Sequence, residues 1–162
     1  MFKVVIGTMV KNEDDIIKYW IDYHGSIFGY NNLYIIDNNS TDNTYNICKQ
    51  YPEITLYKID NYTKKGEYMS YLINTIACDI FIPLDIDEFV VYYNKNTNKI
   101  SNNNLISYLE NLKIKYNSYD IFKMNYIIPI KTNNNEDIYQ FTQGKIEDYK
   151  EYAKTFIKPE YK

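Results

Sequence analysis

The chain has 162 residues, with 18 basic and 21 acidic side chains and a formal net charge of −3. This length predicts one compact domain, and a composition that is 45% hydrophobic and 24% charged excludes a mainly disordered chain. Nucleic-acid phosphates are held mainly by surplus lysine and arginine, so a chain of net negative charge is not expected to bind nucleic acid. An anionic ligand would need a metal ion to screen the acidic side chains.

The apolar stretches are too short to span a bilayer, and the first residues lack the cleavage site of a secretory signal. We therefore expect a cytoplasmic protein without a membrane span. The two cysteines, Cys48 and Cys78, lie far apart without a CxxC pattern or a histidine beside them. We interpret them as buried thiols and not as zinc ligands.

Short apolar runs alternate with segments of helical pattern in the first half of the chain. The runs are Val4–Ile6, Leu33–Ile36, Ile54–Ile59 and Ile80–Leu84. Apolar residues between Ile16 and Phe28 recur mostly at three-to-four spacing, which predicts an amphipathic helix. Shorter helices are expected around Thr44–Cys48 and Tyr68–Ile76. This alternation predicts an α/β sheet with parallel strands.

The pattern changes after Phe89. Val90–Tyr93 is interpreted as a strand, and Leu105–Ile114 as a helix capped near Ser101. Ile121–Ile130 is expected to form a strand pair or one bent strand, and the segment from Ile138 to Ile157 alternates only weakly. The parallel repeat is therefore expected to end before the second half of the chain.

Acidic residues follow three of the predicted strands: Asp37, Asp60, and the group Asp85, Asp87 and Glu88. Ligands of open parallel sheets bind beyond the carboxyl ends of the strands, so these carboxylates are expected to meet on one edge. Several carboxylates on one edge repel each other unless a cation or a donor-rich ligand compensates for the charge. The pattern therefore points to a metal-assisted site.

Asp85 and Asp87 are the sharpest pair, because an extended backbone places residues i and i+2 on one face and turns Ile86 to the core. Two carboxylates can hold Mg²⁺ or Mn²⁺ and leave positions open for substrate phosphates. A DxD triplet alone is common and also occurs as a solvated acidic turn. Its place at a strand end favours the metal site.

Three motifs follow one another in the first half of the chain. They are Lys11-Asn12-Glu13 followed by Trp20 and His24, then Asp37-Asn38-Asn39-Ser40-Thr41-Asp42, then Asp85-Ile86-Asp87-Glu88-Phe89. In this order they resemble the family-2 type of glycosyltransferase, and more closely a branch, related also to family 92, that reads KNE, W..YH, a D.(N/G).STD turn and D.DEF. The resemblance runs from about Val4 to Phe89 and returns more faintly at residues 154–159.

The resemblance implies a GT-A fold, a Rossmann-like and mostly parallel sheet flanked by helices, with a mixed C-terminal part. It implies metal-dependent transfer of a sugar, with inversion, from a nucleotide-sugar donor, often a UDP sugar, to an acceptor hydroxyl. Mn²⁺ or Mg²⁺ would be the cofactor, and a glycan, protein or small molecule the acceptor. We expect one domain over residues 1–162, with a donor-binding half (1–92) and an acceptor half (93–162). Complete enzymes of this type are longer, so this half could be truncated, or the chain could be part of a longer multidomain protein.

The resemblance also implies residue roles. The nucleotide pocket would be lined by Thr8, Val10, Lys11, Asn12 and Glu13. Asp37 would contact the base or ribose, Asp85 the ribose or a metal-bound water, and Asp87 the metal, so that Asp85 and Asp87 form the metal site. The general base is not identified by any motif. Glu136 and Asp137 are the downstream candidates, and a charged loop is the alternative reading of this pair; Lys154 and Lys158 could meet the diphosphate or be solvated.

Other interpretations remain open. His24, the single histidine, is interpreted as a hydrogen-bonded packing residue beside Trp20 and not as a base. A sugar-nucleotide pyrophosphorylase would carry a glycine-rich phosphate loop where this chain has Thr8–Glu13. The non-enzymatic alternative is a catalytically degenerate domain that binds a glycan or a partner protein. Turnover of a nucleotide sugar separates these possibilities.

Overall fold

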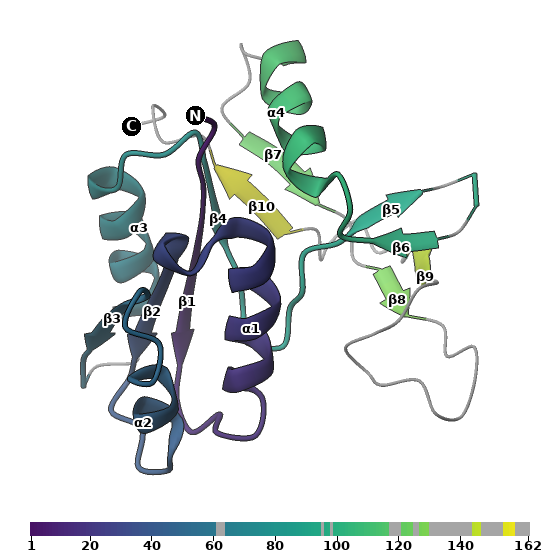
Figure 1. The fold of residues 1–162 in the computed structure, drawn as a ribbon. Coiled ribbons are helices and arrows are strands. Elements are labelled where there is room, and N and C mark those ends of the chain that lie inside the picture. The colour runs from purple at the N-terminus through teal and green to yellow at the C-terminus, as the bar shows by residue number, and fades with distance from the viewer. Residues whose placement is uncertain are drawn as a thin grey trace, which may run out of the picture.

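A computed structural model describes residues 1–60, 64–94, 96–97 and 99–116, and the backbone of four further strands. A six-stranded sheet in the order β3-β2-β1-β4-β10-β7 forms the centre of the fold (Figure 1). Its parallel part consists of β1 (Val4–Val10), β2 (Leu33–Asp37), β3 (Thr55–Lys58) and β4 (Ile80–Pro83). Strand β10 (Lys154–Ile157) runs antiparallel to β4 and to β7 (Ile121–Met124).

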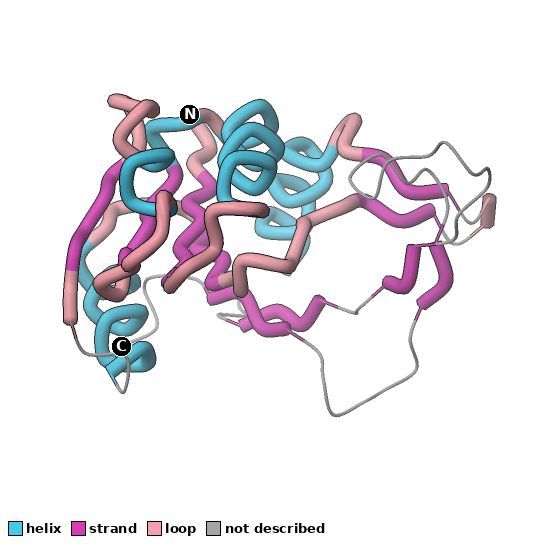
Figure 2. Tube along the Cα trace, turned by 90° about the horizontal axis from the view of Figure 1, so that it is seen from below, coloured by secondary structure: helices cyan, strands magenta, loops and turns pink. Residues whose placement is uncertain are grey.

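Helices cover both faces of this sheet (Figure 2). They are α1 (Ile17–Phe28), the short η1 (Tyr30–Asn32), α2 (Thr44–Cys48), α3 (Lys65–Thr75) and α4 (Leu105–Lys115). Alternate residues of β1 face opposite sides, so that Val4 and Ile6 pack with α1, α2 and α4, while Val5 and Met9 pack with α3. The result is a three-layer α/β arrangement.

The central strand β1 is buried along all seven of its residues, as expected for a parallel strand with helices on both faces. Gly7 of β1 is required by packing, because a Cβ atom there would lie 2.5 Å from the ring of Phe81 in β4. On the other face, Ile17, Trp20 and Ile21 of α1 are fully buried. Their three-to-four spacing is the one that predicts the helix from sequence.

The second half of the chain adds two small antiparallel sheets beside the main one (Figure 1). Strand β5 (Tyr92–Asn94) pairs with β6 (Lys99–Ser101), and β8 (Ile127–Pro129) pairs with β9 (Gly144–Ile146). The helices within the described residues are all too short or too polar to traverse a lipid bilayer.

The predicted fold class, a mostly parallel α/β sheet flanked by helices with a mixed C-terminal part, is confirmed. Two local predictions need correction. Helix α4 begins after Asn104, whose φ is 68°, and Ser101 does not cap it because Ser101 ends β6 and its hydroxyl accepts from the N–H of Asn103 at 3.0 Å. The predicted strand pair over 121–130 consists of β7 and β8, which belong to different sheets.

Candidate functional site

Three loops meet at the C-terminal edge of the parallel strands. They are residues 11–16 after β1, 38–43 after β2 and 84–91 after β4, and we call them together the rim. The register of the strands places the starts of the loops side by side, because Val10 pairs with Asp37 and the N–H of Leu84 donates to the carbonyl of Gly7 at 2.9 Å. The sequence prediction that carboxylates follow these strands therefore places them on one edge.

The first two loops are joined by hydrogen bonds between motifs that lie about 30 residues apart. The N–H of Asn12 donates to Ser40 Oγ at 3.0 Å, and Asn12 Oδ1 accepts from the N–H of Thr41 at 2.8 Å. The N–H of Glu13 donates to Thr44 Oγ1 at 2.7 Å. Asn12 adopts a left-handed backbone with φ 57°, a conformation that asparagine tolerates better than most residues. Asn12 thus has a structural task in addition to its predicted place in the pocket.

Asp42 also joins the first two loops by a hydrogen bond. Its Oδ1 accepts from the N–H of Thr44 at 3.0 Å and its Oδ2 from the N–H of Asp14 at 3.2 Å. Burial opposes ionisation, but the hydrogen bonds from Thr44 and Asp14 dominate and lower the pKa of Asp42. Asp42 therefore holds the start of α2 through the N–H of Thr44.

Polar groups without partners are buried beneath these loops. Asp37 is fully buried and its Oδ2 accepts from the N–H of Ser40 at 3.3 Å, but Oδ1 has no partner among the described residues. The same holds for Thr8 Oγ1 and for both side-chain polar atoms of Asn38. An unsatisfied buried group costs about 1–3 kcal/mol. Thr8, Asp37 and Asn38 therefore have unused hydrogen-bonding capacity that a ligand's polar groups could satisfy.

Asp85 and Asp87 lie in a tight turn and not in an extended strand, so the extended geometry predicted from sequence is wrong. Strand β4 ends at Pro83, and the N–H of Glu88 donates to the carbonyl of Asp85 at 3.1 Å. The side chain of Glu88 returns to this turn and its Oε2 accepts from the N–H of Asp85 at 2.7 Å. The predicted separation of faces holds nevertheless, because Ile86 packs in the core and Asp87 is exposed.

Lys65 is a residue of this site that the sequence analysis did not select. It begins α3, and its Nζ forms an ion pair with Oδ1 of Asp85. The available signal was the Lys64-Lys65-Gly66 segment ahead of the third helical pattern. A cation beside the DxD pair gives the rim a group able to meet a phosphate.

The rim is otherwise acidic. Burial, followed by the charges of Asp15, Asp87 and Asp42, raises the pKa of Glu13. Asp87, which follows β4, is thus among the charges that act on Glu13, which follows β1. Within the described residues, no three histidine, cysteine or acidic side chains are grouped to hold a metal. Carboxylate oxygens, such as those of Asp85 and Asp87, are the donors that Mg²⁺ and Mn²⁺ prefer.

One face of α1 contacts the backbone that follows the DxD pair. Trp20 Nε1 donates to the carbonyl of Glu88 at 3.1 Å, and the hydroxyl of Tyr23 donates to the carbonyl of Val90 at 2.8 Å. His24 is fully buried, and burial lowers its pKa to about 3. Both of its ring nitrogens are engaged, with the carbonyl of Trp20 and the N–H of Val90. The interpretation of His24 as a packing residue is therefore confirmed.

The remaining site residues differ in how far the structure describes them. Val10 is buried in the core, so only its backbone could reach a ligand, and its carbonyl already accepts from the N–H of Asn38 at 2.9 Å. Lys11 is exposed on the rim. The candidate bases Glu136 and Asp137 lie outside the described residues, as does Lys158, and Lys154 is described only by its backbone in β10.

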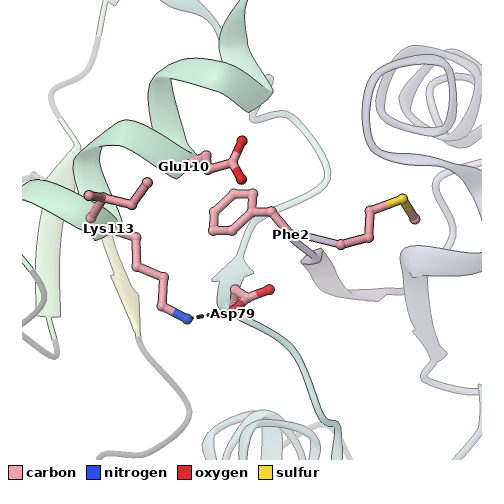
Figure 3. Close-up of a pocket in the computed structure, with 6 residues that line it drawn as sticks. Phe2, Asp79, Glu110 and Lys113 are labelled. Carbon is pink, nitrogen blue, oxygen red and sulfur yellow. Dashed lines mark hydrogen bonds and ion pairs between the residues drawn. The ribbon is translucent and has the colours of Figure 1, made fainter.

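A separate pocket of about 510 Å³ lies at the opposite, N-terminal end of β1 and β4 (Figure 3). It is lined by Met1, Phe2, Asp79, Glu110, Lys113 and Ile114. Lys113 forms an ion pair with Asp79, which also accepts from the backbone N–H of Lys3. This pocket contains none of the rim residues and is not part of the candidate site.

No protein-family profile matches the chain, and no curated protein is similar to it in sequence. In structure it is similar to the mannosyltransferase PcManGT from Pyrobaculum calidifontis, solved with GDP-Man and Mn²⁺, at 16% identity and a TM-score of 0.50 over 67% of this chain and 31% of the other. The GT-A fold is the fold of this chain.

Two further neighbours have lower TM-scores. TarS 1–349 from S. aureus gives 0.49 at 16% identity, over 85% of this chain and 38% of TarS. Glucosyl-3-phosphoglycerate synthase from Mycobacterium tuberculosis, solved with Mn²⁺, UDP and glucosyl-3-phosphoglycerate, gives 0.43 at 18% identity, over 56% of this chain and 34% of the synthase. The chain thus spans roughly a third of the length of each of these neighbours.

Proposed function

We propose that this GT-A chain is a metal-dependent glycosyltransferase that moves a sugar from a nucleotide-sugar donor, a UDP sugar in the first instance, to an acceptor hydroxyl with inversion. The observation that supports the proposal is the meeting of Glu13, Asp37 and the Asp85–Asp87 turn on one edge of the sheet. The KNE, STD and DxDEF motifs supply these residues, and we assign the chain to the branch that carries them.

Asp85 and Asp87 would hold the divalent cation, Mn²⁺ or Mg²⁺, through carboxylate oxygens. When bound, the cation neutralises negative charge that develops on the departing diphosphate. Lys65 would add a second positive charge on the same side, since it already contacts Asp85. Glu88 keeps its side chain on the backbone of the turn, and its role is to shape that turn.

The nucleoside would lie over the first two loops of the rim. Asp37 and Thr8 supply buried oxygen atoms without partners, which suit the donor groups of a base or ribose. Lys11, Asn12 and Glu13 would border the pocket, and Val10 would contribute through its backbone. This division of roles follows the positions that the resemblance implies.

The acceptor would be a glycan, a protein or a small molecule. Its hydroxyl must lose a proton as it attacks the anomeric carbon from the face opposite the leaving group. Glu136 and Asp137 are the candidates for the base that takes this proton. We propose one domain over residues 1–162, in which 1–92 bind the donor and 93–162 contribute to the acceptor side.

The test is release of nucleoside diphosphate from a panel of UDP sugars and GDP-mannose, with Mn²⁺ and water as the default acceptor, compared with Asp87→Asn. Metal-dependent release by the native chain alone would support the proposal. Binding of UDP with Mn²⁺ but no release, even with added glycan acceptors, would support the degenerate binding domain. Failure to bind any nucleotide with or without Mn²⁺ would refute both donor-based functions.

A further inference from the structure

Residues 84–91, which carry the DxD pair, belong to no helix or strand. The N–H of Leu84 is anchored to β1, and Asp85 and Glu88 close the turn between them. Beyond Glu88 the backbone is tied to α1 by side chains. Because no sheet ladder fixes this stretch, the position of Asp87 depends on these anchors.

The three anchoring side chains, Trp20, Tyr23 and His24, occupy one face of α1 at i, i+3 and i+4. Their bonds to Glu88 and Val90 span 66–68 residues of chain and measure 3.1, 2.8 and 3.3 Å. Both the N–H and the carbonyl of Val90 are engaged, as they would be in a sheet. Side chains of a helix thus replace a missing strand neighbour.

The chemistry of His24 is fixed by this arrangement. The N–H of Val90 is a donor, so Nε2 of His24 must be the acceptor, and the neutral ring then carries its proton on Nδ1 and donates to the carbonyl of Trp20 at 3.0 Å. The ring of Phe89 stacks on His24 with centroids 5.6 Å apart and meets the edge of Tyr23 at 5.2 Å. The W..YH and DEF motifs therefore form one interlocked unit.

We propose that Trp20, Tyr23 and His24 are positioning residues that hold the Asp85–Asp87 turn in the geometry needed to bind a metal and a nucleoside diphosphate. This inference rests on the proposed function. A turn held in place before binding loses less conformational freedom when the metal and diphosphate arrive, so the affinity is higher. Each of the three side chains acts through the backbone of residues 88–90, to which it is hydrogen-bonded.

The most conservative perturbation is Tyr23→Phe, which removes only the hydroxyl that donates to Val90. The matched control is Tyr51→Phe, which removes a hydroxyl bonded to Asp22 and Lys18 of the same helix. Each change removes hydrogen bonds that join a tyrosine hydroxyl to another group, with α1 on one side of the bond. Hydrogen bonds of this kind are worth on the order of 1 kcal/mol each. Only Tyr23 reaches the 84–91 loop by its hydroxyl.

The experiment measures the Kd of UDP in Mn²⁺ by calorimetry, hydrogen exchange of the Val90 amide, and the melting temperature of each variant. We expect Tyr23→Phe to bind UDP about fivefold more weakly and to exchange the Val90 amide faster. We expect Tyr51→Phe to match the native chain in both readouts. Equal loss of affinity in both variants would mean a general effect on stability and would overturn the inference.

A second pair of variants separates hydrogen bonding from packing at His24. His24→Gln offers an amide oxygen to the N–H of Val90, whereas His24→Leu keeps apolar volume and removes the acceptor. We expect the glutamine variant to retain more UDP affinity than the leucine variant. The opposite order, or equal affinities in two folded variants, would overturn the inference. If the native chain itself shows no Mn²⁺-dependent UDP binding, the proposed function fails. This result differs from a failure of the positioning role, in which the native chain binds UDP but the variants bind it equally well.

Discussion

Lys65→Met tests whether the lysine ammonium beside the DxD pair serves nucleotide binding or only the fold. Methionine keeps an unbranched, apolar stem and removes the ammonium that pairs with Asp85. The side chains of this pair are 38% and 44% exposed, and an ion pair of this exposure contributes about 0.2–1 kcal/mol to folding. For a domain of this size that corresponds to a shift of about 2–4 °C at most in melting temperature.

The expected effect on the bound state is larger. A hydrogen bond between a lysine and a charged phosphate is worth about 1.5–3 kcal/mol. At 1.4 kcal/mol for each factor of ten, UDP affinity in Mn²⁺ should fall by about ten- to hundredfold. Mn²⁺ alone should bind equally well or more tightly, because removing the ammonium increases the negative potential around Asp85 and Asp87. A lower affinity for UDP without a lower affinity for Mn²⁺ is the result expected if Lys65 binds the diphosphate.

Calorimetry with Mn²⁺ alone and with UDP at saturating Mn²⁺ gives both affinities, and thermal unfolding gives the stability. Lys18→Met is the matched control, since Lys18 forms an ion pair with Asp22 on the surface of α1 with side chains 60% and 43% exposed. This control should leave UDP affinity unchanged. A Lys65→Met protein that binds UDP within twofold of the native chain would refute the assignment of Lys65 to the diphosphate.

Three further predictions concern the rim and the anchor of its third loop. Asp87→Asn should abolish Mn²⁺-dependent UDP binding in calorimetry, while the melting temperature without ligand holds or rises, because repulsion with Glu13 is relieved; a lower melting temperature with intact binding would make Asp87 structural. Asp37→Asn keeps the buried volume, so the stability of the fold should not fall. Because the carboxylate is lost, UDP should bind at least about tenfold more weakly, by roughly 1.4 kcal/mol; unchanged affinity would exclude a nucleotide contact. The pKa of His24 is lowered from 6.5 to about 3, so between pH 6.5 and 5 the imidazole gains a proton in the unfolded chain but stays neutral in the folded one. Urea unfolding should therefore show that the free energy of unfolding falls with decreasing pH, by up to about 1.4 kcal/mol per pH unit in this range. His24→Gln should lack this pH-dependent component. Parallel pH curves for the native chain and His24→Gln would contradict a buried neutral imidazole.

The sequence alone determined the elements and the edge on which to look. Apolar spacing reports which side of a segment is buried, so α1 and the four parallel strands could be read from their own residues. The carboxylates Asp37, Asp85 and Asp87 could be assigned to one edge because the C-terminal ends of parallel strands share it. These patterns describe each helix or strand by itself, and they do not tell which elements pack against each other.

Only the tertiary structure decided which residues meet across the chain. The sheet order places β10, from the end of the chain, against β4, and no local pattern encodes a partner more than 70 residues away. The DxD pair sits in a turn and not in a strand because Glu88 folds back on Asp85. Lys65 belongs to none of the sequence motifs, and the W..YH motif that contains His24 does not by itself tell which group the ring contacts. The two residues acquire their tasks because α3 and α1 carry them to Asp85 and Val90, and a side chain's role depends on the neighbours that the folded chain supplies.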